Sequence, residues 1–231
     1  MNMNLEDLMF VASVWALPLL VAITFHEAAH AFVALRLGDK TAYLLGRVNF
    51  NPLCHIDFFG TVILPALLLL ASGGGIMFGY AKPVPVNFSN FKRPRQDMML
   101  VAIAGPGVNV ALALISAVLL HTIPYMSGDV AKWVGLNLGN SIFLNLIFAV
   151  FNMLPILPLD GGRIAVGFLP RIISKSLMRL ERFGFFIIMG GFFVLPLIAK
   201  KFGVNLNVFW WLVGEPASFF SRIILKITGI Y

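Results

Sequence analysis

The feature that most constrains this chain is an apolar segment from Leu8 to Leu37 that contains two histidines and a glutamate. About 20 consecutive apolar residues cross a bilayer as a helix, so the segment predicts a membrane span. Within it, residues four apart lie on one face of the helix, which places His26 and His30 together with Glu27 beside them. Ionisable side chains are costly inside a membrane span, and we therefore interpret these three as functional.

Composition supports a membrane protein. The 231 residues are 59% hydrophobic and 12% charged, with a mean hydropathy of +0.91, which is outside the range of soluble domains. The net charge of +7 comes from basic residues in short loops, where they act as topology signals. We expect the lipid bilayer as a partner and no nucleic acid. The single cysteine, Cys54, excludes an intrachain disulfide and a cysteine-rich zinc site.

The hydrophobic pattern predicts one integral-membrane domain over 1–231, all-α, with about 5–6 membrane segments. We place its core at about 8–165 and its C-terminal membrane segments at about 183–225. Acidic Glu6 and Asp7 replace the basic start of a signal peptide, so we expect the first segment to be retained. The segment Phe58–Tyr80, interrupted by Pro65 and three glycines, is ambiguous: it either crosses the bilayer or folds back.

Two segments predict a small membrane-embedded β element. Thr41–Phe50 is rich in strand formers and is followed by Asn51-Pro52, a turn signal. Lys82–Asn87 contains two prolines, which forbid a helix and favour an extended edge strand. Bare strand edges are not tolerated against lipid, so we expect these strands to pack on protein close to the two histidines.

A catalytic zinc site has three protein ligands and an open position for water. His26 and His30 provide two ligands, and the candidates for the third are Asp160, Asp57, His55 and Asp39. Glu27 is the predicted general base. His55 and Asp57 are better suited to holding a loop than to binding the ion.

Charge placement favours Asp160 as the third ligand. Acidic residues precede the first span and Arg36, Lys40 and Arg47 follow it, so its C-terminal half, with the histidines, lies on the cytoplasmic side. Two further spans, Met98–Thr122 and Leu136–Leu157, return the chain to the same side at Asp160. This count requires Phe58–Tyr80 to fold back, and we predict that it does.

Two asparagines lie in apolar segments and could serve the same site. The amide of Asn152 or of Asn109 could stabilise an oxyanion in hydrolysis. For Asn109, a hydrogen bond between helices is an equal alternative.

Three motifs in this order resemble the site-2 protease family of intramembrane zinc metalloproteases: His26-Glu27-Ala28-Ala29-His30, Ala104-Gly105-Pro106-Gly107-Val108-Asn109, and Asn152 through Gly162 with Leu159-Asp160-Gly161-Gly162 at its end. The segments 51–57 and 81–87 resemble the compact bacterial branch, without a PDZ or CBS domain. The resemblance implies one catalytic zinc ion held by His26, His30 and Asp160, with Glu27 as the base. It also implies Asn152 near the substrate carbonyl and a substrate strand paired with Val84, Val86 and Asn87.

The sequence therefore predicts hydrolysis of peptide bonds in the transmembrane segments of membrane-protein substrates. The predicted location is a bacterial inner membrane, with the site near the cytoplasmic side. Two other classes remain open: a metal-binding transporter, which would show paired broken helices in repeated halves, and a catalytically silent scaffold. The chain shows no internal repeat.

Overall fold

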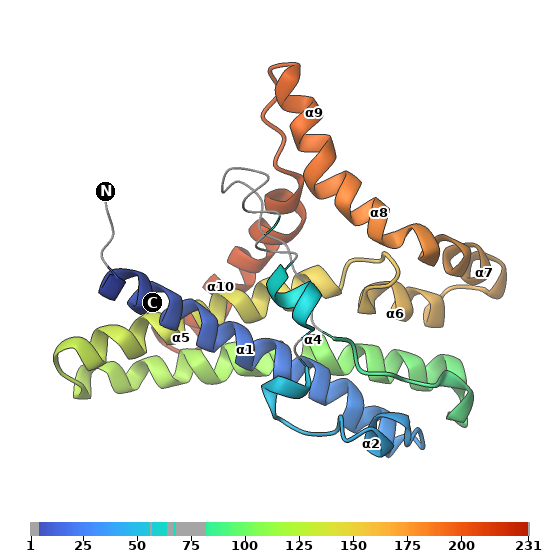
Figure 1. Cartoon of the computed structure of the whole chain (residues 1–231), viewed down its shortest axis with the longest axis horizontal. Coiled ribbons are helices and arrows are strands. Elements are labelled where there is room, and N and C mark those ends of the chain that lie inside the picture. Colours follow the sequence, from blue (N-terminus) through green and yellow to red (C-terminus); the bar gives the residue numbers. More distant parts are fainter. Residues whose placement is uncertain (1–4, 56, 64–66, 68–81, 231) are drawn as a thin grey trace.

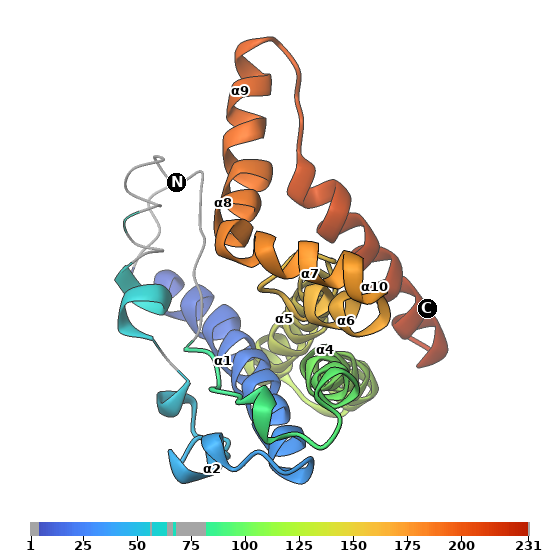
Figure 2. The same cartoon turned by 90° about the vertical axis from the view of Figure 1, so that its right-hand side faces the viewer.

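Three long helices form the centre of the protein. The structure, a computed structural model, describes residues 5–55, 57–63, 67 and 82–230. Helices α1 (Leu5–Arg36), α4 (Pro94–Leu119) and α5 (Gly128–Asn152) pack against one another (Figures 1 and 2). α1 and α5 run in one direction and α4 in the other, as the charge count predicted (Figure 1).

Short elements connect and extend the long helices (Figure 1). After α1 come α2 (Thr41–Leu44), a 3₁₀ turn at Pro52–Cys54 and a π-helical turn at Phe58–Ile63. A 3₁₀ turn at Phe88–Asn90 precedes α4, and another, Leu120–Tyr125, extends it. α6 (Asp160–Phe168) follows α5 after a short turn and packs on α4.

The last quarter of the chain begins with a nearly continuous helical rod that leans away from the bundle, and the segment after the rod returns to it (Figure 1). The rod consists of α7 (Arg171–Leu180), Glu181–Phe183, α8 (Gly184–Met189), Gly190–Val194 and α9 (Leu195–Lys201). Trp210–Gly214 and α10 (Glu215–Ile227) then bring the chain back against α5, and α10 also contacts α4.

The bundle buries several polar side chains among small apolar ones and exposes large apolar side chains. Large residues such as Trp15, Phe32 and Val118 are exposed on the helices, whereas Asn109 and Asn145 are fully buried. Small buried residues, among them Ala22, Ala28, Ala31, Ala34, Ala113 and Ala117, let the helices approach closely. Buried polar groups beneath an apolar exterior suit a bundle whose solvent is lipid.

Four helical segments of the described residues are long and apolar enough to cross a membrane: Met9–Arg36, Pro94–Tyr125, Gly128–Asn152 and Arg171–Lys201. Of the C-terminal membrane segments predicted at about 183–225, the last part, Val208–Leu225, is not among them. Its helix carries Glu215, Arg222 and Lys226, which lower its hydropathy. Most of Phe58–Tyr80 lies outside the described residues, so its predicted fold-back stays a prediction.

The predicted strand at Thr41–Phe50 was wrong. Asp39 accepts hydrogen bonds from the Thr41 backbone N–H (3.1 Å) and hydroxyl (2.5 Å), and these bonds start the short helix α2 instead. Gly46 then turns the chain with a φ of 65°. Lys82–Asn87 is an irregular segment, and the described part of the chain contains no strand for it to pair with.

Candidate metal centre

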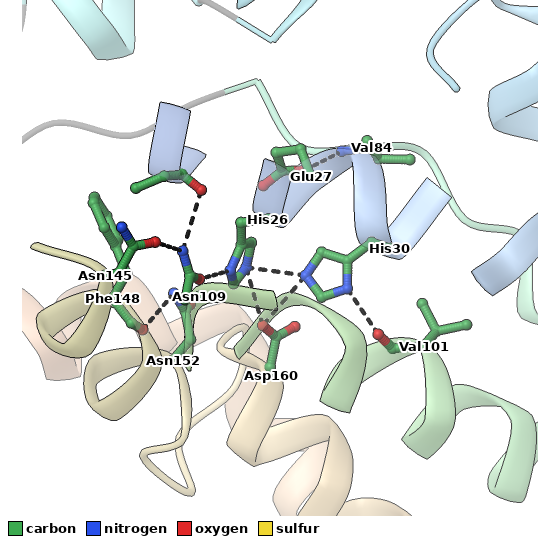
Figure 3. A network of polar contacts seen from close by, with 11 residues as sticks. His26, Glu27, His30, Val84, Val101, Asn109, Asn145, Phe148, Asn152 and Asp160 are labelled. Carbon is green, nitrogen blue, oxygen red and sulfur yellow. Dashed lines mark hydrogen bonds and ion pairs between the residues drawn. The ribbon is translucent and has the colours of Figure 1, made fainter. Parts of the chain in front are cut away.

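Three side chains from distant parts of the sequence meet inside the bundle. His26 and His30 come from α1 and Asp160 is the first residue of α6, and all three are buried (Figure 3). The Nε2 atoms of the two histidines are 3.0 Å apart, and each lies 3.3 Å from Oδ2 of Asp160. Within the described ranges, this is the one group of three such residues whose ligand atoms all lie within 4.8 Å of one another.

Hydrogen bonds on the far side of each ring fix where the histidines carry their protons. Nδ1 of His30 lies 2.8 Å from the backbone carbonyl oxygen of Val101, which can only accept, so Nδ1 donates. Nδ1 of His26 donates in the same way to Oδ1 of Asn109 over 2.6 Å. In its neutral form, each ring therefore directs an Nε2 lone pair at the shared centre, an arrangement typical of metal-binding histidines.

The centre fits a metal ion. Three lone-pair groups converge on it, and Oδ2 of Asp160 is buried with no hydrogen-bond partner among the described residues. Such a cluster of acceptors is stable only around a cation. Zinc bonds of about 2.0–2.2 Å in tetrahedral geometry place ligand atoms about 3.3–3.6 Å apart, and the ligand atoms here are 3.0 and 3.3 Å apart.

Gly105 keeps the space between the ligands open. A Cβ atom at this position of α4 would lie 2.5 Å from Nε2 of His30 and 2.6 Å from Nε2 of His26. Both distances are too short for a non-bonded carbon atom, so any side chain at this position would fill the space between the two Nε2 atoms. The glycine of the second motif therefore leaves room for an ion.

Asp160 reaches the histidines because α6 begins close under the end of α5. A Cβ on Gly161 would collide with the carbonyl oxygens of Met153 and Leu154, and one on Gly162 with the backbone of Ile156 and Leu157. The two glycines thus let the helix start pack directly on the preceding turn, in which the Leu157–Pro158 peptide is cis.

The far end of α6 is held by one arginine of α4. Nη2 of Arg95 donates to the carbonyl oxygens of Val166 (2.9 Å) and Leu169 (2.5 Å). These carbonyls lie at the C-terminal end of the helix, where a cation also interacts favourably with the helix dipole. Arg95 therefore fixes the position of α6 relative to the bundle.

The other third-ligand candidates lie elsewhere and hold loops. His55 Nε2 donates to the carbonyl oxygen of Asn49 (3.0 Å), and its own carbonyl accepts from the Lys82 N–H (3.0 Å). Asp57 accepts from the Gly60 N–H (2.6 Å). Asp39, fully buried, accepts from Thr41, Asn87 and Asn90. Of the four candidates, the fold brings Asp160 alone to the histidines.

Glu27 lies beside the centre and bonds to the irregular segment 82–87. Its Oε2 accepts a 2.8 Å hydrogen bond from the backbone N–H of Val84 (Figure 3). Val84 and Val86 are half-buried and Asn87 is exposed. The Asn87 N–H donates to Asp39 over 2.8 Å. Two N–H groups of the predicted substrate strand are thus already engaged by carboxylates, and pairing with a substrate there remains a prediction.

The two asparagines of the motifs have different surroundings. The two Nδ2 hydrogens of Asn109 have two acceptors, the Ala22 carbonyl oxygen (3.2 Å) and Oδ1 of Asn145 (2.8 Å). Asn109 therefore bonds helices together and supports His26, as in the alternative given above, and has no hydrogen left for an oxyanion. Nδ2 of Asn152 donates to the carbonyl oxygen of Phe148 (3.1 Å), one turn earlier on α5 (Figure 3).

Comparison with known proteins decides the family. The model of a family described as Peptidase family M50 matches residues 14–128 and 123–198, which is most of the chain. The chain belongs to this family, the site-2 proteases. Family M50 comprises zinc metalloproteases, and with its apolar helices the chain is an integral membrane enzyme of that class.

Curated relatives agree with this assignment. A Bacillus subtilis protein named "Putative zinc metalloprotease YwhC" is 42% identical over 184 residues, covering 78% of this chain and 79% of the relative. Rip2 of Mycobacterium tuberculosis H37Rv is 32% identical over 83% of this chain and 70% of its own length, and carries the same description. MJ0611 of Methanocaldococcus jannaschii, which has the same description, is 27% identical over 70% of this chain and 72% of its own length. No solved structure matches the chain.

Three residues of this M50 site were not predicted from the sequence in these roles. Gly105 and Asn109 stand in a recognised motif, but neither the ion space nor the bond to His26 follows from it. Asn145 was missed altogether. The sequence did contain a signal: Asn145 is an amide within an apolar span, a position that is costly without hydrogen-bond partners.

Proposed function

We propose that this M50 member is an intramembrane protease that uses one zinc ion to hydrolyse peptide bonds within or near transmembrane segments of membrane-protein substrates. The observation that carries the proposal is the convergence of His26, His30 and Asp160 in a buried position on helices whose outer surfaces are apolar. A site buried among membrane-spanning helices is suited to a substrate that is itself in the membrane, rather than to a soluble one.

The chain's own residues provide the groups that hydrolysis needs. A zinc ion held by His26, His30 and Asp160 would lower the pKa of a water molecule and polarise the scissile carbonyl. Glu27, beside the two histidines, takes a proton from the water and later delivers it to the leaving amine. Its Oε2 accepts from the Val84 N–H, so we assign the proton transfer to Oε1.

Asn152 is our candidate for the oxyanion donor. One hydrogen of its Nδ2 goes to the carbonyl oxygen of Phe148, which fixes the direction of the amide at the end of α5. The second hydrogen is the donor that we assign to the substrate carbonyl. Loss of one such donor costs about 10²–10³ in kcat in other hydrolases.

The segment 82–87 is our candidate for the substrate contact. It passes beside Glu27, to which it is bonded, and Val84 and Val86 are half-buried against the protein. A substrate unwound into an extended strand would lie along Val84, Val86 and Asn87 by β-strand addition. Because Val84 and Asn87 already donate to Glu27 and Asp39, we propose that substrate pairing exchanges at least one of these bonds.

Charge supports an orientation with the site toward the cytoplasm. Basic residues gather at the end of the bundle that carries α2, the start of α4, and α6 and α7 (Figure 1): Arg36, Lys40, Arg47, Lys92, Arg93, Arg95, Arg163 and Arg171. The opposite end has the acidic residues Glu6, Asp7 and Asp129 and fewer basic ones, Lys132 and Lys226, the latter in the last turn of α10 close to the His121–Thr228 bond. By the positive-inside rule, the basic end faces the cytoplasm of a cell membrane.

The test is cleavage of a single-span substrate by the purified protein in detergent, with mass spectrometry of the products. We expect cuts within or beside the transmembrane segment, loss of cleavage after chelation, and recovery with added zinc. Asp160→Ala should lose both zinc and cleavage, whereas Asp129→Ala, a change at the exposed far end, should keep both. Bound zinc without any cleavage would contradict the proposal and favour a transporter or scaffold.

A further inference from the structure

A chain of buried polar side chains continues from the metal centre into the bundle. Asn109 of α4 donates from Nδ2 to Oδ1 of Asn145 on α5 over 2.8 Å, and Asn145 is fully buried. Nδ2 of Asn145 donates in turn to the carbonyl oxygen of Ser141 (2.8 Å) and to its hydroxyl (3.2 Å). The Ser116 hydroxyl donates to that of Ser141 over 2.8 Å. Because Asn109 also bonds to His26 and to the Ala22 carbonyl oxygen of α1, these polar groups link all three central helices.

These contacts fix the direction of the Asn109 amide. The Ala22 carbonyl oxygen can only accept, so Nδ2 of Asn109 must face it, and Oδ1 must face His26. Oδ1 of Asn145 accepts the second hydrogen of the same Nδ2. If the Asn109 amide turned over, its oxygen would face two acceptors and its NH₂ group would face the Nδ1–H of His26. The partners on both sides thus oppose the flip.

Asn109 in turn fixes the tautomer of His26. Its Oδ1 accepts from Nδ1–H over 2.6 Å, which places the proton away from Nε2. A histidine ligand must present a free lone pair to the ion, and a fixed acceptor at the other ring nitrogen keeps that lone pair available. If Asn109 loses its orientation, the His26 proton is free to move to Nε2 and block the position.

We propose that Asn145 is a positioning residue for the metal centre: through Asn109 it holds His26 in the tautomer that binds the ion. This inference rests on the proposed zinc site, but not on proteolysis. Asn145 contacts no ligand itself and acts through one intermediate side chain. The bonds that orient a ligand are worth about 10–100-fold in metal affinity, and we expect an effect in that range for Asn145.

A purely structural role for Asn145 makes the opposite prediction for two substitutions. If Asn145 only joined α4 to α5, Asn145→Leu would preserve packing, while Asn145→Asp would bury a carboxyl group in the membrane and be the worse change. A positioning role requires an oxygen that accepts from Asn109. Asp retains that oxygen and Leu removes it, so Asp should rescue and Leu should not.

The experiment measures zinc affinity of the full chain in detergent by competition with a chromophoric chelator. We expect Asn145→Leu to weaken binding by about 10–100-fold and Asn145→Asp to stay within a few-fold of wild type. The matched control is Asn137→Leu, because Asn137 is also buried on α5 and donates from Nδ2 to the carbonyl oxygen four residues earlier, that of Trp133. It should bind zinc normally.

The tautomer provides a second readout on the same samples. Long-range ¹H–¹⁵N spectra of metal-free protein should show the His26 proton on Nδ1 in wild type and Asn145→Asp, and a growing Nε2–H population in Asn145→Leu. Should the Leu variant not fold, Asn145→Ser, whose hydroxyl is too short to reach Asn109, takes its place.

The outcomes separate this inference from the proposed function. Wild-type zinc affinity and tautomer in Asn145→Leu, or equal losses in the Leu and Asp variants, would overturn the positioning role while the zinc site stands. A wild-type protein that binds no zinc would overturn both.

Discussion

The backbone N–H of Val84 donates a 2.8 Å hydrogen bond to Oε2 of Glu27, across 57 residues of sequence. The bond joins the predicted general base on α1 to the segment that we assign to the substrate. A hydrogen bond from a fixed N–H orients a carboxylate, so the position of the base depends on how this segment lies.

Val84→Pro tests that dependence, because it removes the N–H while keeping an extended backbone between two other prolines. We predict that kcat for cleavage falls about 10–100-fold, since a misplaced catalytic group costs rate in that range, while bound zinc is unchanged. Val84→Ala retains the N–H and is the control. Equal rates in the Pro and Ala variants would show that the bond does not orient Glu27.

Gly105→Ala tests the space reserved for the ion. The new Cβ would lie 2.5–2.6 Å from Nε2 of both histidines, so we predict loss of bound zinc and of cleavage. Gly107→Ala, on the same helix, meets nothing within 4 Å and should behave as wild type. Zinc per protein by elemental analysis measures the effect, with size-exclusion chromatography to check folding. Undiminished zinc in Gly105→Ala would place the ion elsewhere.

Asp39→Asn tests the carboxylate that joins the end of α1 to segment 82–90. Burial raises the pKa of Asp39, but hydrogen bonds from Thr41, Asn90 and Asn87 outweigh it, so its pKa lies below the ordinary value. Folding therefore favours the ionised form. Its stabilisation is complete above the unfolded pKa of about 4 and is lost as pH falls through the lower folded pKa.

We therefore predict that Asp39→Asn is less stable than wild type at pH 7 by about 1–3 kcal/mol. The difference should shrink progressively below about pH 4. Thermal unfolding in detergent across this pH range measures it, with Asp129→Asn, an exposed change, as the control. A difference that is the same at pH 7 and pH 3 would assign the loss to packing rather than to the charge.

The sequence predicted the parts of the site that depend on local periodicity and on topology. The i, i+4 spacing placed His26 and His30 together, and the alternation of basic and acidic loops returned Asp160 to the same end. The site-2 protease resemblance agreed with both. The family assignment therefore needed no structure.

The sequence did not predict the parts that depend on how helices rotate against one another. Asn109 and Asn145 are 36 residues apart on different helices, and their contact depends on which faces α4 and α5 present. The strand predicted at 41–50 failed for a different reason: the side chain of Asp39 offered the backbone of Thr41 a local partner, and strand propensity could not reveal that.

The central claim is that the centre is a zinc protease with Glu27 as its base, and Glu27→Gln tests it most directly. The variant and wild type are compared for bound zinc and for cleavage of a single-span substrate, with Glu181→Gln, an exposed change, as the control. Because Glu27 is not a ligand, the account predicts full zinc content and a loss of cleavage of about 10²–10⁴-fold, the usual contribution of a general base. Cleavage by Glu27→Gln at the wild-type rate would contradict it.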